Sequence, residues 1–264
     1  MRALHWFLGT AAVLAGCFFF LQSDPGLGPG DSSKPRIVVL CAAGLKGPLE
    51  SIARSFESDT GIAVELDFGG SQTLFARLSD PHRPADVFLP ADESYIRIAR
   101  EKALVGGGTA LVSMQAVVIV RKPASPPTWA DLTSGRLRVA QADPSVAAVG
   151  RRTQEALAPA DWRALNAATT VYKPTVSDVL NAVRLGGVDA GVVWDAIVLP
   201  HPDLLAVHLP QLAGVTARVE AAVAVKGPNP HATERFVRYL ADPTRGGAAF
   251  RTAGYAIAGP ATAR

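Results

Sequence analysis

Cysteine is scarce in this chain: the 264 residues contain two, Cys17 and Cys41. A small protein held together by disulfides needs a larger, paired set of cysteines, and Cys17 lies within the apolar N-terminal segment. A disulfide framework is therefore excluded. Cys41 ends a short apolar run, where we expect it to be a small residue of the core.

An excess of charge of one sign is also missing. The chain has 26 lysines and arginines against 23 aspartates and glutamates, a net charge of +3. These residues are scattered, without the basic stripe typical of nucleic-acid-binding proteins, so we expect no nucleic acid as a partner. Because 48 % of the residues are hydrophobic, the chain can bury a large core, and its length allows one large or two modest domains.

Histidine is rare, and no spacing is typical of metal ligands or of a catalytic acid–base pair. The five histidines are His5, His82, His201, His208 and His231. The motif G-x-x-x-x-G-K-[ST] is absent, so an ATPase that works with this protein would be another chain. The stretch "GGSQT" misses the serine-hydrolase motif G-x-S-x-G, because Thr73 replaces its last glycine. We predict no enzyme, no metal and no cofactor, with a serine hydrolase that uses Ser71 as the alternative.

The N-terminus carries a targeting signal. After Arg2 and His5, residues 6–21 contain no charge, a length within the signal-peptide range and slightly short for a membrane-spanning helix. We therefore assign residues 1–22 to a signal, lipoprotein or anchor segment. Residues 23–35 are rich in Gly, Pro and Ser and are expected to form a flexible linker to the folded part.

The letters "LAGC", which end at Cys17, resemble the lipobox of bacterial lipoproteins, in which the cysteine becomes lipidated after cleavage. Against lipidation, the apolar residues 18–21 follow this cysteine, where such proteins usually turn polar. An uncleaved anchor helix and ordinary cleavage near Ser23 are the alternatives. All three place the folded part outside the inner membrane, in the periplasm or on the outer face of that membrane.

From Arg36 onward, short apolar runs alternate with helical periodicity, which predicts parallel α/β sheets flanked by helices. Residues 37–41 are typical of a buried strand, and an amphipathic helix follows at i, i+3, i+4, i+7 spacing. Its inward residues are Leu49, Ile52, Ala53 and Phe56. Further strands are expected at residues 64–68, 86–89, 116–121, 137–140, 170–172, 190–194 and 220–225. Further helices are expected at residues 73–78, 93–102, 147–157, 177–185, 232–240 and 244–252, and the three glycines at 106–108 are expected to interrupt the pattern.

These elements fall into two α/β lobes. The first lobe is expected to comprise residues 36–118 with 222–264, and the second residues 119–221. Long strands near residues 116–121 and 220–225 would cross from one lobe to the other. In such a fold the carboxyl ends of the strands and the N-termini of the helices face a ligand cleft between the lobes.

Strand-to-helix junctions with little side-chain bulk occur in both lobes. They are "AAGLKG" at 42–47, "FGGSQT" at 68–73 and "PTVSDV" at 174–179. The N-terminus of a helix offers unpaired backbone N–H groups and the positive end of its dipole, and Gly44, Gly69 and Gly70 would let an anion approach those donors. Ser71 adds a hydroxyl. The alternative is that the glycines form plain turns, with Ser71 and Ser177 as N-caps.

The stretch from "VVLCAAGLKGPLESIARSF" to "DFGGSQT", together with "LRVAQADPSVAAVGRRTQEAL" and "VDAGVVWDA", resembles the periplasmic molybdate- and tungstate-binding proteins of ABC importers. The resemblance covers nearly everything after the linker. It implies a type II periplasmic-binding fold, whose two lobes close over a tetrahedral oxyanion held by backbone amides and a few hydroxyls.

By motif position, the resemblance also implies a set of ligand contacts. They are Gly44, Leu45, Gly70, Ser71, Val149, Val179 and Trp194. Val149 and Val179 would contribute backbone amides of lobe two. Gly44 and Gly70 stand where many members of the family have serine, and Trp194 stands at a common tyrosine position and can donate only through its indole N–H. The site would therefore depend on backbone amides.

Proton balance favours one group of anions. Molybdate, tungstate and sulfate only accept hydrogen bonds at neutral pH, whereas phosphate and arsenate keep a proton that needs an acceptor, so a site made only of donors favours the first group. We also expect Asp92, Ser177 and Asp195 to lie near the ligand. One alternative is that they act as helix caps and as contacts between the lobes. The other, for the two carboxylates, is that they contact the ligand, and such a site would admit phosphate or a hard cation.

The sequence thus predicts an exported solute-binding protein that captures a tetrahedral oxyanion, molybdate or tungstate first, and delivers it to the membrane permease of an ABC importer. A binder of phosphate, sulfate or another small ligand on the same fold is the alternative. We expect a monomer that reaches the membrane through its N-terminal segment.

Overall fold

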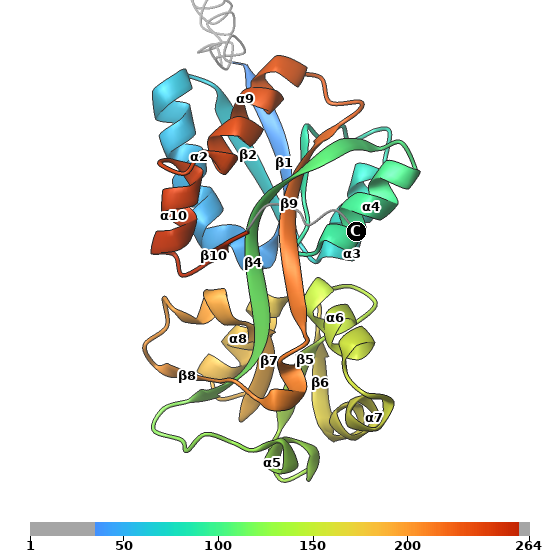
Figure 1. Ribbon diagram of the computed structural model, residues 1–264, viewed down its shortest axis with the longest axis vertical. Coiled ribbons are helices and arrows are strands. Elements are labelled where there is room, and N and C mark those ends of the chain that lie inside the picture. The colour runs from blue at the N-terminus through green and yellow to red at the C-terminus, as the bar shows by residue number, and fades with distance from the viewer. Residues whose placement is uncertain (1–34, 259–264) are drawn as a thin grey trace, which may run out of the picture. The chain divides into compact units, whose positions relative to one another are not determined.

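The computed structural model describes residues 35–258 (Figure 1). The predicted signal segment, the linker up to residue 34 and the predicted lipidation site at Cys17 lie outside the described residues. None of the helices in the described range is long and apolar enough to cross a membrane.

The first lobe is built on a mixed sheet with the strand order β2-β1-β3-β9-β4. β1 pairs in parallel with β2 and β3, and β9 runs antiparallel to β3 and β4. The strands are β1 (Arg36–Ala42), β2 (Ala63–Gly69), β3 (Val87–Leu89), β4 (Val105–Arg121) and β9 (Thr216–Ala224), with the short β10 (Ala256–Ile257) paired to β4.

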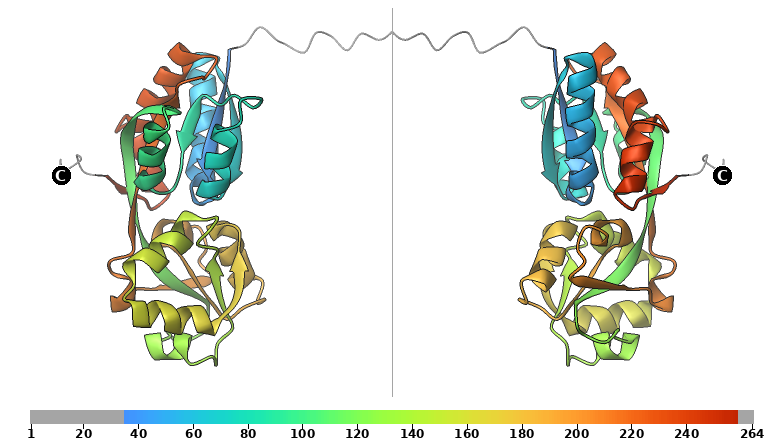
Figure 2. Two further views of the ribbon diagram at one scale, coloured as in Figure 1. Left: turned by 90° about the vertical axis from the view of Figure 1, so that its right-hand side faces the viewer. Right: turned by 90° about the vertical axis from the view of Figure 1, so that its left-hand side faces the viewer.

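Helices cover both faces of this sheet (Figures 1 and 2). On one face lie α2 (Lys46–Thr60), α9 (Pro230–Ala241) and α10 (Gly246–Thr252), and on the other α3 (Ser71–Leu78) and α4 (Glu93–Glu101). The predicted inward face of α2 is confirmed, since Leu49, Ile52, Ala53 and Phe56 are all buried. The Phe56 ring contacts Phe236 of α9 edge to face at a centroid distance of 5.0 Å, which fixes α2 beside α9.

The second lobe continues the same sheet through β7, β5 and β6. β5 pairs in parallel with β6 and β7, whereas β7 and β8 run antiparallel to β4. Its strands are β5 (Val139–Ala142), β6 (Thr169–Lys173), β7 (Ala190–Trp194) and β8 (Leu204–Val207). Its helices are α5 (Trp129–Thr133), α6 (Ala148–Ala156), α7 (Pro159–Ala168) and α8 (Val176–Arg184), and the 3-10 turns are η1 (Ala43–Leu45, in lobe one), η2 (Asp195–Val198) and η3 (Pro210–Leu212).

β4 and β9 cross between the lobes, as predicted (Figure 1). β4 changes partner along its length: Gln115 still pairs with Thr216 of β9, and the next residue, Ala116, pairs with Trp194 of β7. The predicted lobe limits at 118/119 and 221/222 fall within β4 and β9. The fold class, two mostly parallel α/β lobes joined by crossing strands, is confirmed.

The prediction that the glycines at 106–108 interrupt the pattern is wrong, because β4 begins at Val105 and includes them. The pairing of β4 with β9 shifts register between Val105 and Gly108, and a Cβ atom on Gly108 would collide with the side chain of Glu220. The glycines therefore mark a β-bulge. Helix α7, helix α5 and strand β8 were not predicted, although Pro159 at the first turn of α7 is a usual helix-start signal.

Candidate functional site

The strand-to-helix junctions of the two lobes meet around a small cavity of about 20 Å³. A single buried water needs about 10–15 Å³, so the cavity suits a compact ion rather than an organic molecule. Its walls are Ala42, Ala43, Gly44, Gly69, Gly70, Ser71 and Ala91 from lobe one and Ala147, Ala148, Val149, Thr175, Val176 and Trp194 from lobe two. Of the predicted ligand contacts, the structure brings together Gly44, Gly70, Ser71, Val149 and Trp194.

Ser71 is the first residue of α3 and is 2 % exposed. Its Oγ atom accepts a hydrogen bond of 3.1 Å from the Ala91 N–H group, which joins the β2–α3 and β3–α4 junctions. This contact uses an oxygen lone pair, so the hydroxyl proton remains a donor for an acceptor in the cavity. The side chain of Ser71 thus does not act as a helix cap.

Gly70 and Gly44 lie where the two lobes touch. A Cβ atom on Gly70 would come within 2.7 Å of the Val146 carbonyl oxygen, and one on Gly44 within 3.1 Å of a methyl group of Val176. The backbone of Gly70 is in an ordinary extended conformation, with φ −69° and ψ 147°. The close approach of the lobes therefore requires glycine at position 70 and favours it at position 44, in addition to the access to backbone donors that the sequence indicated.

Three of the helix starts that line the cavity lack a side-chain cap. Gly70 before α3, Ala147 before α6 and Ala42 before η1 provide no capping side chain. The first N–H groups of a helix have no partner within it. In α3 one of them, the Gln72 N–H group, already donates across the lobes to the Val146 carbonyl oxygen at 3.0 Å. The other N–H groups at these starts offer backbone donors to an anion. By contrast, α8 is capped by Thr175, which accepts from Asp178 N–H, and α4 by Asp92, which accepts from Ser94 N–H.

Two predicted ligand residues lie outside the cavity wall. The N–H group of Val179 donates to the Thr175 carbonyl oxygen at 3.2 Å, an ordinary bond within α8, and Val176 lines the cavity in its place. Leu45 is fully buried at the end of η1, while its neighbours Ala43 and Gly44 form the wall.

Neither predicted carboxylate faces the cavity. Asp195 accepts hydrogen bonds from the N–H groups of Gln115 and Ala196, at 3.1 and 2.8 Å, and so ties β7 to the crossing strand β4. Asp92 is paired with Arg151 and Arg152 of α6. No acidic residue and no histidine occurs among the described residues that line the cavity.

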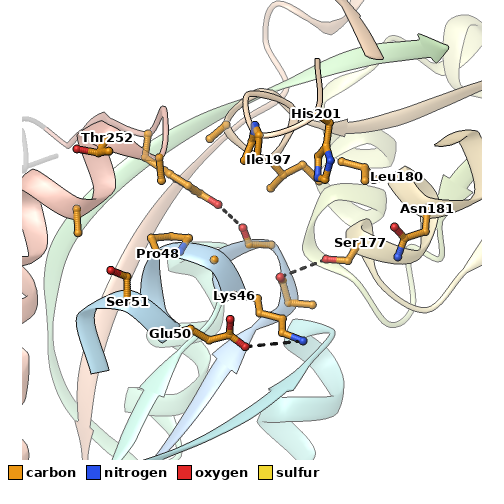
Figure 3. A pocket seen from close by; sticks show the side chains of 18 residues that line it. Lys46, Pro48, Glu50, Ser51, Ser177, Leu180, Asn181, Ile197, His201 and Thr252 are labelled. Carbon is orange, nitrogen blue, oxygen red and sulfur yellow. Dashed lines mark hydrogen bonds and ion pairs between the residues drawn. The ribbon is translucent and has the colours of Figure 1, made fainter. Parts of the chain in front are cut away.

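Ser177 does not line the cavity, and its side chain links the two lobes. Its hydroxyl donates to the carbonyl oxygen of Ala43 at 3.2 Å, from α8 to the turn after β1 (Figure 3). This contact borders a larger groove of about 640 Å³ between α2, α8, η2 and α10. Ala43 and Gly44 line both spaces, so the turn that contains them separates the groove from the small cavity.

Tyr255, just before β10, fixes this turn from the other side. Its hydroxyl donates a hydrogen bond to the Gly44 carbonyl oxygen. Burial, with the neighbouring Cys41 and Asp195, raises the pKa of the Tyr255 hydroxyl, so it stays a neutral donor. Cys41 itself is buried, and burial raises the pKa of its thiol, which confirms it as a core residue and not a reactive nucleophile.

A metal centre finds no support in the described range: no group of three or more His, Cys, Asp or Glu side chains there could hold an ion. The hydrolase alternative would need a base beside Ser71. The neighbour of its Oγ is the Ala91 N–H group, which cannot accept a proton.

The two α/β lobes are joined by crossing strands and enclose a cavity that uncapped helix starts border. This architecture is that of a solute-binding protein. Residues 37–256 match the family of bacterial extracellular solute-binding proteins, and the chain belongs to this family. Among curated relatives, the chain is 29 % identical to the molybdate-binding protein ModA of Mycobacterium tuberculosis strain H37Rv over 240 residues, 87 % of this chain and 89 % of the relative.

Solved structures confirm the fold. The periplasmic molybdate-binding protein of Azotobacter vinelandii is 21 % identical, with a TM-score of 0.71 over 84 % of this chain and 100 % of that one. The sulfate-binding protein SubI of Mycobacterium tuberculosis is 15 % identical, with a TM-score of 0.73 over 86 % of this chain and 88 % of that one. At this level of identity the similarity shows the fold alone.

Proposed function

We propose that this protein captures a tetrahedral oxyanion, molybdate or tungstate first, in the cavity between its lobes and delivers it to the membrane permease of an ABC importer. The observation that carries the proposal is the convergence of uncapped helix starts from both lobes, at Gly70, Ala147 and Ala42, on one small cavity. The similarity to ModA over most of both chains supports the choice of ion.

The chemistry of the wall supports a fully deprotonated anion. The Ser71 hydroxyl and the indole N–H of Trp194 are donors, and the cavity-lining hydroxyl of Thr175 already donates to Asp178. With no carboxylate or imidazole in the wall, the proton of hydrogen phosphate would have no side-chain acceptor of that kind. An unmatched buried polar group costs about 1–3 kcal/mol, which favours molybdate, tungstate and sulfate over phosphate.

Sulfate is the second candidate. It carries the same charge and shape as molybdate and likewise only accepts hydrogen bonds, and the sulfate-binding protein SubI shares the fold. The volume of about 20 Å³ belongs to the closed lobes and favours the smaller ion, whereas the sequence similarity favours molybdate. A competition experiment between sulfate and molybdate for the same site decides which ion binds more tightly.

Delivery depends on closure of the lobes. Each lobe contributes part of the donors, so an anion bound between them stabilises the closed form, which the permease would distinguish from the open form. Attachment to the membrane through the lipobox at Cys17 would keep the protein near that permease. The lipobox lies outside the described residues and stays a prediction.

A thermal-shift screen of the purified protein tests the proposed function. The panel contains molybdate, tungstate, sulfate, phosphate and chloride salts at equal ionic strength. A ligand at about 100 times its dissociation constant stabilises the fold by about 2.7 kcal/mol, so molybdate or tungstate should raise the melting temperature clearly and phosphate should not. Equal melting temperatures across the panel would contradict oxyanion binding. Turnover of an ester substrate that is lost in Ser71→Ala would instead support the hydrolase.

A further inference from the structure

An ion-pair cluster joins the lobes beside the cavity. Asp92 of lobe one has a fully buried side chain, and two arginines of lobe two pair with it across the cleft. Arg151 Nη2 lies 3.3 Å from Asp92 Oδ1, and Arg152 Nε lies 3.1 Å from Asp92 Oδ2. We call Asp92, Arg151 and Arg152 the interlobe cluster.

Further contacts fix both arginines against lobe one and the crossing strand. The guanidinium of Arg151 lies over the ring of Tyr95 in α4, 4.2 Å from its centroid, and also contacts the Ser94 hydroxyl. Arg152 Nε donates to the carbonyl oxygen of Thr216 at the start of β9, at 3.0 Å. Both arginine side chains are mostly covered, with 21 % and 26 % of their surface exposed, so salt screens these pairs less than it screens pairs at the surface.

The arginines belong to the helix that presents its first amides to the cavity. Val149 lines the cavity in the first turn of α6, and Arg151 and Arg152 follow directly after Gly150. Whatever holds these two side chains against lobe one therefore also holds the Val149 amide at the cavity.

We propose that Arg151 and Arg152 are positioning residues, which pair with Asp92 only when the lobes are closed and so hold the α6 amides against the bound anion. The proposal rests on the proposed function, since it names what keeps the oxyanion in place. The cluster acts on the release of the ion rather than on its capture.

The physical reason is the difference between the two states. In an open form Asp92 would be hydrated and would keep its helix-capping bond to Ser94 N–H, at 2.7 Å, because both partners lie in lobe one. The pairs with Arg151 and Arg152 cross the cleft and exist only in the closed form. Removing the charge of Asp92 would leave two mostly covered arginines without their common partner, and removing one arginine would leave the buried carboxylate with a single partner. Either change raises the free energy of the closed state alone.

The two edges of the cleft differ in how they are held. At the edge between α4 and α6, the interlobe cluster provides charged contacts. At the edge between α2 and α8, the Ser177–Ala43 hydrogen bond borders the groove of about 640 Å³. We therefore expect charge changes at the first edge to alter ion release most.

The experiment compares wild type with Asp92→Asn, Arg151→Gln and Arg152→Gln. Asparagine keeps the size and the helix-capping oxygen of Asp92 while it removes the charge. The matched control is Arg138→Gln, which breaks the 2.7 Å ion pair of Arg138 with Asp189 inside lobe two. Melting temperatures of the ligand-free proteins confirm that each variant is folded, and Arg152→Gln, at a partly exposed side chain, serves if Asp92→Asn does not fold.

Stopped-flow kinetics with molybdate provide the first readout. Each cluster variant should release molybdate about 10-fold faster or more, while its association rate stays within about 2-fold of wild type, because truncating one partner of a buried charge pair acts mainly on dissociation. Arg138→Gln should match wild type in both rates. Unchanged dissociation in both Asp92→Asn and Arg152→Gln would overturn the proposal.

Interlobe distances provide a second readout that does not depend on the ligand. Spin labels at Glu101→Cys in α4 and Gln154→Cys in α6, both exposed, report the distance across the cluster edge. The cluster variants should lose short-distance population in the ligand-free protein, and Arg138→Gln should not. If wild type binds no oxyanion, the proposed function fails, and these distances still test whether the interlobe cluster holds the lobes together. Identical distance distributions in wild type and Asp92→Asn would contradict the role of the cluster alone.

Discussion

The Ala91 N–H group donates a hydrogen bond of 3.1 Å to the Oγ atom of Ser71, and both residues line the cavity between the lobes. The bond orients the hydroxyl and leaves its proton for an anion. One side chain therefore connects the stability of lobe one with ligand binding.

Replacing Ser71 by alanine should weaken binding of the oxyanion. A hydrogen bond to a charged partner contributes about 1.5–3 kcal/mol, so we expect a loss of about 10- to 150-fold in affinity by isothermal titration. The ligand-free variant should also lose about 1–3 kcal/mol in free energy of unfolding, because the buried Ala91 N–H loses its acceptor.

Thr73→Ala is the control for Ser71→Ala. Thr73 lies in the same helix but does not line the cavity, so the variant should bind the anion as wild type does. Normal affinity in Ser71→Ala would show that the hydroxyl does not contact the ligand.

Adding one methyl group at Gly70 should oppose closure. In Gly70→Ala the Cβ atom would come within 2.7 Å of the Val146 carbonyl oxygen of the opposite lobe, while the backbone angles of residue 70 suit alanine. We expect at least about 10-fold weaker anion binding, corresponding to about 1.4 kcal/mol, with an unchanged melting temperature of the ligand-free protein. Gly47→Ala, where a Cβ atom would meet nothing within 4 Å, should leave affinity unchanged; equal affinities in the two variants would refute the steric account.

The buried thiol of Cys41 should make stability fall at alkaline pH. Burial raises its pKa, whereas the unfolded thiol loses its proton near its ordinary pKa of about 8.5. Above that pH the folded state binds more protons, so the free energy of unfolding decreases by up to about 1.4 kcal/mol per pH unit. Urea unfolding between about pH 8 and pH 10 should show this slope, and Cys41→Ala should reduce it. An identical slope in the variant would mean that the thiol titrates alike in both states.

The lipobox at Cys17 predicts that the mature protein is anchored by lipid. Cys17→Ser should fail to acquire lipid and should change its processing, as followed by membrane fractionation and by mass spectrometry of the N-terminus. If wild type and variant remain equally membrane-bound, the apolar segment itself is the anchor.

Local patterns were sufficient to predict most of the fold. The buried face of α2 follows from its helical spacing, and β1 from its apolar run. The glycines at 106–108 misled the prediction because glycine usually ends a strand, whereas here they lie at a register shift between β4 and β9, and Gly108 packs against Glu220, a residue far along the chain. Short elements such as α5 and β8 carry too few residues for a clear period.

The candidate site was predictable only in part. Small residues at the junctions marked Gly44, Gly70 and Ser71, because a helix start with little bulk has a local sequence signal. The pairing of Asp92 with Arg151 and Arg152 has no such signal, since it depends on how two lobes meet. Val179 does not line the cavity, for a related reason. Helix α8 begins at Val176, and this first residue of the helix lines the cavity wall, whereas the fourth residue, Val179, does not.

The most direct test of the account is isothermal titration of the purified protein with molybdate and with phosphate at about pH 7.5, under equal ionic strength. A cavity walled by donors should bind one molybdate per chain, at least about 5-fold and up to about 150-fold more tightly than phosphate, the ratio given by an unmatched polar group of about 1–3 kcal/mol. Phosphate binding as tight as molybdate binding, or no heat from either ion, would contradict the oxyanion site described for Gly44, Gly70, Ser71, Val149 and Trp194.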